Sequence, residues 1–213
     1  MKKYQLVIWD WNGTLLNDVN WCVDVINAML AKRRLKTLDG LKAYQGVFGF
    51  PIIDYYKKLG FDFEEEPFGV LAKEYIELYH SKNSGGCGLH KNAVSVLDTL
   101  NKHVVTQVVL SASEIGNLRK QMSGFNIDFY FDEVLGLCDI YAKSKVEIGL
   151  DYINRKRIGR AVLIGDTQHD AEVASKIGAD CLLVCSGHHS REKLEELAFP
   201  VLDDVAQVLD YIL

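Results

Sequence analysis

The sequence lacks any apolar run long enough to cross a membrane. No stretch approaches the roughly 18 uninterrupted apolar residues of a transmembrane helix. The N-terminus also passes from two lysines straight into a short strand pattern, which is not the layout of a signal peptide. We therefore expect no membrane partner.

Cysteine is scarce and shows no pairing pattern. The five cysteines are odd in number, and no two of them have CxxC spacing. Such usage is typical of reduced thiols rather than of a disulfide framework. It predicts a cytoplasmic location.

A strong charge of one sign is also missing. The net charge is -5, which argues against nucleic acid as a partner. There is no internal repeat or low-complexity segment, and 48% hydrophobic with 25% charged residues is ordinary for a globular chain. The 213 residues suit one large domain, or a core with a smaller insertion, in a monomer or homodimer.

Short apolar runs alternate with helical patterns over most of the chain. The predicted strands are 5–9, 104–110, 133–135, 161–164 and 181–184, with a weaker one near Val201. The predicted helices between them are 91–102, 113–122, 145–155, 170–177 and 191–198. This alternation predicts an α/β fold with a Rossmann-like parallel sheet covered on both faces.

The gap between the first two predicted strands contains helix signals and no convincing strand. One is PIIDYYKKLG, which Pro51 starts and Gly60 ends. A crossover between parallel strands needs only about a dozen residues, and this one is far longer. We therefore predict an α-helical cap domain at 17–84, inserted into a core of 1–16 and 85–213, with SGGCG at 84–88 as the return.

Polar side chains follow the predicted strands at their carboxyl ends, where open α/β sheets place their ligands. Asp10 ends the first strand, with Gly13 and Thr14 close behind. A carboxylate before a glycine turn can attack phosphorus, while the free backbone N–H groups cradle its oxygens. Ser111 follows the second strand, and its hydroxyl could hold a phosphate oxygen.

The segment GDTQHD follows a later strand. Its Asp166 and Asp170 offer the hard oxygen ligands that Mg²⁺ prefers. A lysine would offset charge between these carboxylates and a phosphate, and Lys143 and Lys145 are the candidates. We favour Lys145 because it directly precedes the helical pattern VEIGLDYI, and Lys143 stays the alternative.

Each feature alone also has a structural explanation. Ser111 could cap a helix together with Glu114, and Lys145 could be a surface residue. The two aspartates of GDTQHD could merely start and cap a helix. Their order along the chain, each at the end of its own strand, favours a phosphoryl-transfer site.

This combination resembles the haloacid dehalogenase (HAD) superfamily, especially its phosphoglycolate-phosphatase-like branch. Residues 10–14 match the family motif D-x-D-G-T except at its second acid. Ser111 matches the second motif, Lys145 the third, and residues 165–170 the fourth, GD-x-x-x-D. The helical insertion matches the cap of that branch, so the resemblance covers nearly the whole chain.

The resemblance implies a Mg²⁺-dependent phosphatase of small phosphorylated substrates. Asp10 would be the nucleophile and form an aspartyl-phosphate. Mg²⁺ would be held by Asp10, Asp166 and the backbone carbonyl of Asn12, with Asp170 nearby. The substrate would be contacted by Trp11, Gly13, Thr14, Ser111 and Ala112, with Lys145 beside the transferring phosphoryl. Catalysis would come mainly from positioning and charge stabilisation.

Asn12 departs from the family pattern. The acid usually found there protonates the leaving alkoxide, and such help is worth ~10²–10⁴-fold. Phosphate binding should therefore survive, while turnover of alkyl phosphates should suffer more than that of acyl or aryl phosphates. His188 and His189, or else His169, could replace the acid. Alternatively, the histidine pair is solvated and His169 only caps its helix region.

The cap should select the substrate. Phe48 and Phe50, in the segment VFGFP, lie where related caps present a substrate loop, although this segment could equally be a packed turn. No arginine or lysine lies near it in the sequence to bind a second anionic group. That absence weakens phosphoglycolate itself as the substrate.

Other functions remain open. Asn12 could have cost the protein its turnover, leaving a weakly active or non-catalytic sensor of phosphorylated metabolites. A phosphonate hydrolase is another alternative, since one such member of the superfamily also lacks the acid. A phospho-accepting receiver domain fits less well, because its aspartate lies on a middle strand.

Overall fold

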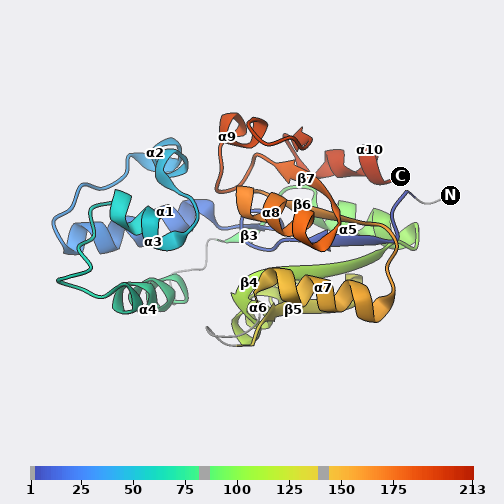
Figure 1. Ribbon diagram of the computed structural model, residues 1–213, viewed down its shortest axis with the longest axis horizontal. Helices are drawn as coiled ribbons and strands as arrows, with labels where there is room; N and C mark the ends of the chain where they lie inside the picture. Colours follow the sequence, from blue (N-terminus) through green and yellow to red (C-terminus); the bar gives the residue numbers. More distant parts are fainter. Residues whose placement is uncertain (1–2, 82–86, 139–143) are drawn as a thin grey trace.

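The computed structural model describes residues 3–81, 87–138 and 144–213. The chain forms two parts that lie end to end (Figure 1). One part is an α/β core that contains both ends of the chain, and the other is a group of helices built from the segment after β1. Within the described ranges, no helix combines the length and the apolarity that crossing a bilayer requires.

The core is built on a six-stranded parallel sheet with the order β5-β4-β1-β6-β7-β8. Its strands are β1 Leu6–Trp9, β4 Thr106–Glu114, β5 Glu133–Leu137, β6 Ala161–Gly165, β7 Asp180–Val184 and β8 Val201–Leu202. The predicted α/β fold with a parallel sheet is confirmed. Asp10, directly after β1, therefore lies between the carboxyl ends of β4 and β6.

Helices cover both faces of this sheet. One face packs on α5 Ala93–Lys102, α6 Ile115–Met122 and α10 Leu209–Ile212, with the 3₁₀ turns η2 Asp128–Tyr130 and η3 Val205–Val208 nearby. The other face packs on α7 Lys145–Lys156, α8 Gln168–Ile177 and α9 Arg191–Glu195. Strand β1 serves both, because Val7 and Trp9 join the first cluster and Leu6 and Ile8 the second.

The helical part contains α1 Val19–Lys32, α2 Gly40–Val47, α3 Ile52–Lys58 and α4 Phe68–Tyr79. These helices bury a hydrophobic cluster of their own, separate from the two clusters of the core. Pro51 precedes α3, and Gly60 follows it with a φ of +92°, a left-handed conformation that suits glycine. These helices lie in the segment for which the sequence predicts the α-helical cap, and they are called the cap below.

Two short strands connect the cap to the core. β2 Leu16–Asn17 pairs antiparallel with β3 Gly88–Leu89, so the outgoing and returning chains lie side by side. The predicted return at 84–88 lies partly outside the described residues. The exact domain limits at 17 and 84 stay a prediction.

Strand β4 is longer than predicted. It continues past Leu110 to Glu114, with a register shift against β5 between these two residues. Ser111 therefore lies within the irregular end of β4 rather than directly after the strand. Such irregular strand ends re-aim side chains, here at the edge of the sheet where the polar residues gather.

Candidate active site

A buried lysine joins the two ends of the predicted site. Lys145 Nζ donates to Asp10 Oδ1 over 2.6 Å and to Asp170 Oδ1 over 2.7 Å. Lys145 starts α7 and is only 4% exposed, so the alternative that it is a surface residue is wrong. Lys143 lies outside the described residues.

Asp170 and Asp166 each accept hydrogen bonds from neighbouring groups, and the donors differ between the two. Asp170 closes a capping box with Thr167, whose hydroxyl donates to Asp170 Oδ2 over 2.7 Å. Asp166 accepts from Thr14 Oγ1 at 3.0 Å and from the backbone N–H of His188 at 2.6 Å. Asp170 is thus a helix cap and a site residue at once.

Gly13 is required by the close approach of Asp166. Its φ is +76°, and a Cβ there would lie 2.4 Å from Asp166 Oδ2. Any larger residue would displace this carboxylate. The glycine of the motif therefore allows the first loop to lie directly over Asp166.

The carboxylate cluster is short of positive charge. Burial raises the pKa of Asp10 to about 7 despite the opposing effect of Lys145. Burial, together with the Asp10 and Asp170 carboxylates, also raises the pKa of Asp166 well above its usual value. For Lys145, burial alone would lower the pKa, but the two carboxylates outweigh it and the pKa is raised. For Asp170, burial alone would raise the pKa, but the Lys145 ammonium outweighs burial and the pKa is lowered.

This cluster could bind a metal ion. Asp10, Asp166 and Asp170 each offer a carboxylate oxygen, and these oxygens lie within 4.8 Å of one another. Lys145 pairs with Asp10 and Asp170 but not with Asp166, and a bound cation would offset the burial and repulsion that raise the pKa values of Asp10 and Asp166. The donor set consists of hard oxygens, which suits a cation such as Mg²⁺.

Ser111 lies in the irregular carboxyl end of β4. Its side chain is buried, and its Oγ accepts from the backbone N–H of Ser113 over 3.1 Å. Ala112 is exposed. Glu114, not Ser111, caps α6, because its carboxylate accepts from the N–H groups of Gly116 and Asn117. The capping alternative for Ser111 is therefore wrong, and its hydroxyl can still donate.

Asn12 is held by a network that the sequence did not reveal. Its Nδ2 donates to Asp18 Oδ2 over 2.8 Å and to the Tyr79 hydroxyl over 2.9 Å. Its Oδ1 accepts from Ser113 Oγ over 3.0 Å. Asp18 also accepts from Tyr79 and, over 2.9 Å, from the backbone N–H of Gly13. The amide therefore has both donors and its oxygen engaged.

The histidine pair is buried rather than solvated. His188 is 7% exposed and His189 1%, so the prediction of a solvated pair is wrong. Burial lowers the pKa of His188 and, with Lys193, lowers that of His189 to about 4. Both imidazoles are thus kept neutral at pH 7. His169 lies further out, where its ring stacks on Phe50.

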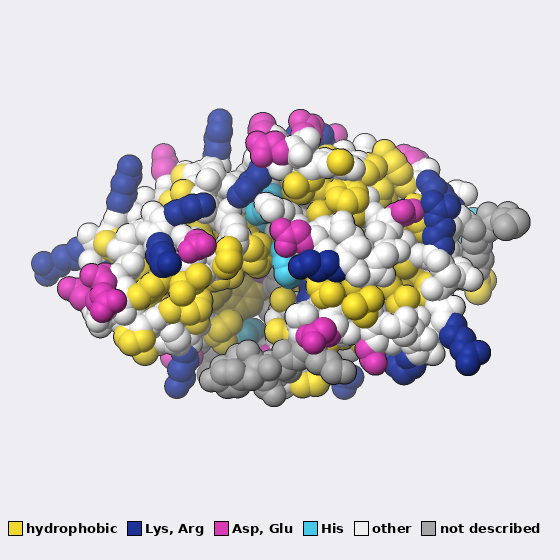
Figure 2. Space-filling model, in the orientation of Figure 1, with side chains coloured by type: hydrophobic (Ala, Val, Ile, Leu, Met, Phe, Trp, Pro, Cys, Tyr) yellow, Lys and Arg dark blue, Asp and Glu magenta, His cyan; other side chains and the backbone are white. Residues whose placement is uncertain are grey.

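The cap contacts the core through the loop after β7. Phe48 stacks on His188, with ring centroids 4.9 Å apart, and Tyr44 OH lies 2.9 Å from His188 Nδ1. Lys193 on α9 donates to the backbone oxygen of Phe48 over 2.5 Å. The expectation that no lysine lies near the segment VFGFP is therefore wrong for the folded chain. Lys193, which is 145 residues away in the sequence, contacts Phe48. Figure 2 shows histidine side chains at this junction.

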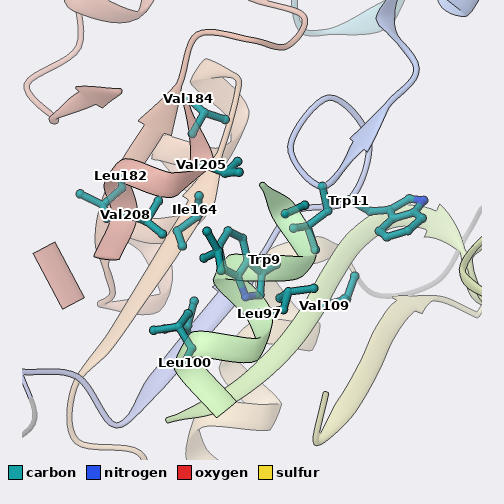
Figure 3. Packing of buried hydrophobic residues seen from close by; sticks show 14 of the residues in the cluster. Trp9, Trp11, Leu97, Leu100, Val109, Ile164, Leu182, Val184, Val205 and Val208 are labelled. Atoms are coloured by element: carbon teal, nitrogen blue, oxygen red, sulfur yellow. The ribbon is translucent and has the colours of Figure 1, made fainter. Parts of the chain in front are cut away.

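The indole of Trp11 packs in the core of the protein. The indole is fully buried in the core cluster, and its Nε1 donates to Gln121 Oε1 over 3.1 Å. Figure 3 shows Trp9 among Leu97, Leu100 and Ile164, and Trp11 to one side of that group. The packing of Trp9 is as predicted, whereas the indole of Trp11 forms no part of an open pocket wall.

A cavity of about 240 Å³ lies between the cap and α6. Trp21 and Tyr79 line it from the cap, and Lys120, Gln121 and Phe125 from the core. It does not coincide with the carboxylate cluster. The Tyr79 hydroxyl joins the two, because it also contacts Asn12.

Comparisons with known proteins give a family and a relative for this chain. Residues 7–184 match the model of the haloacid dehalogenase-like hydrolase family. A protein called probable phosphatase IndB, from Dickeya dadantii, is 23% identical, and the match covers 93% of this chain and 89% of that protein. These matches include both the core and the cap.

Solved structures are similar over almost the full length. A haloacid dehalogenase-like hydrolase from Streptococcus pneumoniae has a TM-score of 0.82 at 16% identity, with 98% of each chain covered. A predicted phosphoglycolate phosphatase from Haemophilus somnus has a TM-score of 0.80 at 17% identity, with 99% of each chain covered. At these identities the likeness concerns the fold. The family match, over most of the chain, shows that this protein belongs to the haloacid dehalogenase-like hydrolases.

Proposed function

We propose that this hydrolase is a Mg²⁺-dependent phosphatase of a small phosphorylated metabolite, acting in the cytoplasm through an aspartyl-phosphate on Asp10. The observation that carries the proposal is the buried Lys145, which bridges Asp10 and Asp170 beside Asp166. A buried charge network with perturbed pKa values is typical of catalytic sites. The relative called a probable phosphatase supports the same class of reaction.

Asp10 is the nucleophile of this proposal. Lys145 binds its Oδ1, so Oδ2 is the oxygen that forms the bond to phosphorus as the bond to the leaving oxygen breaks. The Lys145 ammonium and the Ser111 hydroxyl stabilise the charge on the phosphoryl oxygens. Water then attacks phosphorus, the bond to Asp10 breaks and phosphate leaves.

Asp10, Asp166, Asp170 and the backbone carbonyl of Asn12 are the proposed ligands of Mg²⁺. When bound, the ion neutralises charge on the nucleophile and the phosphoryl group. Thr14 and the N–H of His188 hold the Asp166 carboxylate for this role.

Asn12 determines which substrates turn over well. Its amide has no acid proton to give, and its hydrogen bonds to Asp18, Tyr79 and Ser113 hold it in place. The leaving oxygen must therefore take its proton from water or from another group. Acyl or aryl phosphates, whose leaving groups need little protonation, should react faster than alkyl phosphates.

The test is a screen of phosphorylated metabolites with Mg²⁺, in which Asp10→Asn serves as the blank. Activity that disappears in the blank and in EDTA supports the proposal. Phosphate binding without turnover, in fresh protein, would instead support a sensor of phosphorylated metabolites. The locked Asn12 amide is the one observation that favours this second function.

A further inference from the structure

A second group of metal-ligating side chains lies where the cap meets the core. Asp18 precedes α1, Cys22 lies in the first turns of α1, and His188 lies in the loop after β7. All three are buried, with exposures of 1%, 4% and 7%. One ligand atom from each lies within 4.8 Å of the other two. None of the three is a carboxylate of the proposed Mg²⁺ site.

The spacing of these atoms is close to that of a tetrahedral zinc site. Metal distances of ~2.1 Å to oxygen or nitrogen and ~2.3 Å to sulfur place neighbouring ligand atoms about 3.4–3.6 Å apart. Cys22 Sγ lies 3.8 Å from Asp18 Oδ2, and His188 Nε2 lies 3.9 Å from Asp18 Oδ1. These two contacts go to different oxygens of Asp18, and with a single carboxylate oxygen the three ligand atoms lie within 4.8 Å of one another. A contraction of up to roughly 1.2 Å would therefore bring the three into coordination.

The donor atoms are available and oriented. His188 Nδ1 is engaged by Tyr44 OH at 2.9 Å, while Nε2 makes no hydrogen bond within the described part of the chain. An imidazole held at one nitrogen with the other free is the usual arrangement of a zinc ligand. Asp18 Oδ2 accepts from Asn12, Tyr79 and the Cys22 thiol, whereas Oδ1, among the described residues, accepts only the Gly13 N–H and keeps a lone pair.

We propose that Asp18, Cys22 and His188 form a zinc site that ties the cap to the core. The thiolate, imidazole and single carboxylate oxygen select zinc over Mg²⁺, which prefers an all-oxygen set. On binding, the Cys22 thiol releases its proton to solvent and the sulfur bonds to the ion. Water occupies the fourth position.

Zinc at this place would inhibit the enzyme. Cys22 belongs to the cap and His188 to the core, so one ion would cross-link the two parts at their junction. Asp18 would be drawn towards the ion and away from Gly13 and Asn12, which form the loop over the carboxylate cluster. This consequence rests on the proposed phosphatase function, whereas binding of zinc does not.

The zinc site is tested with Co²⁺, which takes the place of Zn²⁺ and whose visible absorption spectrum depends on its ligands. The purified full-length protein, in excess Mg²⁺ to fill the oxygen site, is titrated with Co²⁺ alone. We expect one equivalent to give the visible bands of tetrahedral cobalt and a thiolate-to-cobalt charge-transfer band, both removed by one equivalent of Zn²⁺. Cys22→Ser should lose the charge-transfer band. Cys87→Ser, a matched change at a nearby thiol, should keep it.

The result that overturns the proposal is a wild-type protein without the charge-transfer band, or a band that survives in Cys22→Ser or disappears in Cys87→Ser. If Cys22→Ser does not fold, cobalt-edge X-ray absorption of the wild type decides, because the site requires one sulfur ligand. Inhibition is tested separately. Zn²⁺ should reduce aryl phosphatase activity at least ~10-fold in the wild type and not in Cys22→Ser. An inactive protein that still binds cobalt through sulfur would refute the phosphatase and leave the zinc site standing.

Discussion

The two halves of the candidate site are both buried and polar, but they are built from different groups. Around Asp10 and Lys145, full charges lie against one another, and two carboxyl pKa values are raised. Around Asn12, a neutral amide lies between a carboxylate and two hydroxyl groups, with every donor and acceptor engaged. In the proposed function, the first half binds the phosphoryl group and attacks its phosphorus. In the second half, hydrogen bonds hold the Asn12 amide in one orientation.

This difference separates binding of the phosphoryl group from delivery of the proton. In the proposed mechanism, the charged half supplies the nucleophile, the lysine and the metal ligands. The amide half contains a carboxylate, Asp18, whose oxygens accept hydrogen bonds from Asn12, Gly13, Tyr79 and the Cys22 thiol. The two halves should therefore respond differently to substitution.

The largest effect is expected from Asp10→Asn. An amide at this position cannot form the aspartyl-phosphate, so kcat should fall by on the order of 10⁴-fold or more, as when other catalytic nucleophiles are removed. Phosphatase assays with fresh protein measure this loss, and circular dichroism checks the fold. A variant that keeps half of the wild-type activity would refute the assignment of Asp10.

Lys145→Met tests how much the charged half contributes to the stability of the fold. Without the ammonium, two buried carboxylates face each other unpaired, which should lower the free energy of unfolding by about 3–5 kcal/mol. Urea unfolding in EDTA measures the change. Lys156→Met on the same helix is the control, because Lys156 pairs with Asp132 at the surface and such a pair contributes only about 0–1 kcal/mol. Equal losses in the two variants would show that Lys145 does not hold the cluster together.

Exchange of the amide and the carboxylate tests the other half. From the sequence alone, Asn12→Asp should raise turnover of an alkyl phosphate by restoring an acid. The contact between Asn12 and Asp18 limits this gain in the single variant. An aspartate at position 12 would face the Asp18 carboxylate across the 2.8 Å that the hydrogen bond now spans. Asn12→Asp with Asp18→Asn keeps the hydrogen bond with donor and acceptor reversed. This double variant should gain ~10-fold or more in kcat on alkyl phosphates, since acid–base help is worth ~10²–10⁴-fold.

Smaller gains are expected from Asn12→Asp alone and with p-nitrophenyl phosphate, whose leaving group needs little protonation. Asn12 precedes Gly13, a pair prone to deamidation, so mass spectrometry of the peptide around Asn12 must accompany each assay. If fresh, fully amidated wild type matches the double variant on alkyl phosphates, Asn12 is no handicap and another group moves the proton.

Much of the charged half could be predicted from the sequence. Asp10, Ser111 and Asp166 each belong to the end of an apolar strand, and parallel strands bring their carboxyl ends to one edge of the sheet. Lys145 could be chosen over Lys143 because a helical pattern starts there. Local patterns sufficed because each residue is placed by its own strand or helix.

The amide half could not be predicted in the same way. Tyr79 is 67 residues from Asn12, and Lys193 is 145 residues from Phe48. No periodicity in the sequence indicates such contacts, because they depend on how the cap packs on the core. Helix α2 was also missed: it spans only eight residues, and Tyr44 is its only buried residue. Asp18 gave one signal, a carboxylate just before a helix, which is usually only a cap.

The smallest effect is expected from Tyr79→Phe, which removes one hydroxyl from the amide half. That hydroxyl donates to Asp18 and accepts from Asn12, so its loss should cost about 1–2 kcal/mol of unfolding free energy. Tyr55→Phe is the matched control within the same cap, because the Tyr55 hydroxyl is buried and has no hydrogen-bond partner among the described residues. Removing an unsatisfied hydroxyl should be neutral or stabilising.

Thermal unfolding compares the two tyrosine variants directly. For a chain of this size, each kcal/mol corresponds to roughly 2–4 °C in Tm, so Tyr79→Phe should melt a few degrees lower and Tyr55→Phe at or above the wild type. If Tyr79 serves only to hold Asn12 and Asp18, its variant should keep kcat on aryl phosphates within ~3-fold of the wild type, well below the ~10²–10⁴-fold of a lost acid or base. A larger loss of kcat at an unchanged Tm would place the phenol among the reacting groups, and the amide half would then take part in the chemistry.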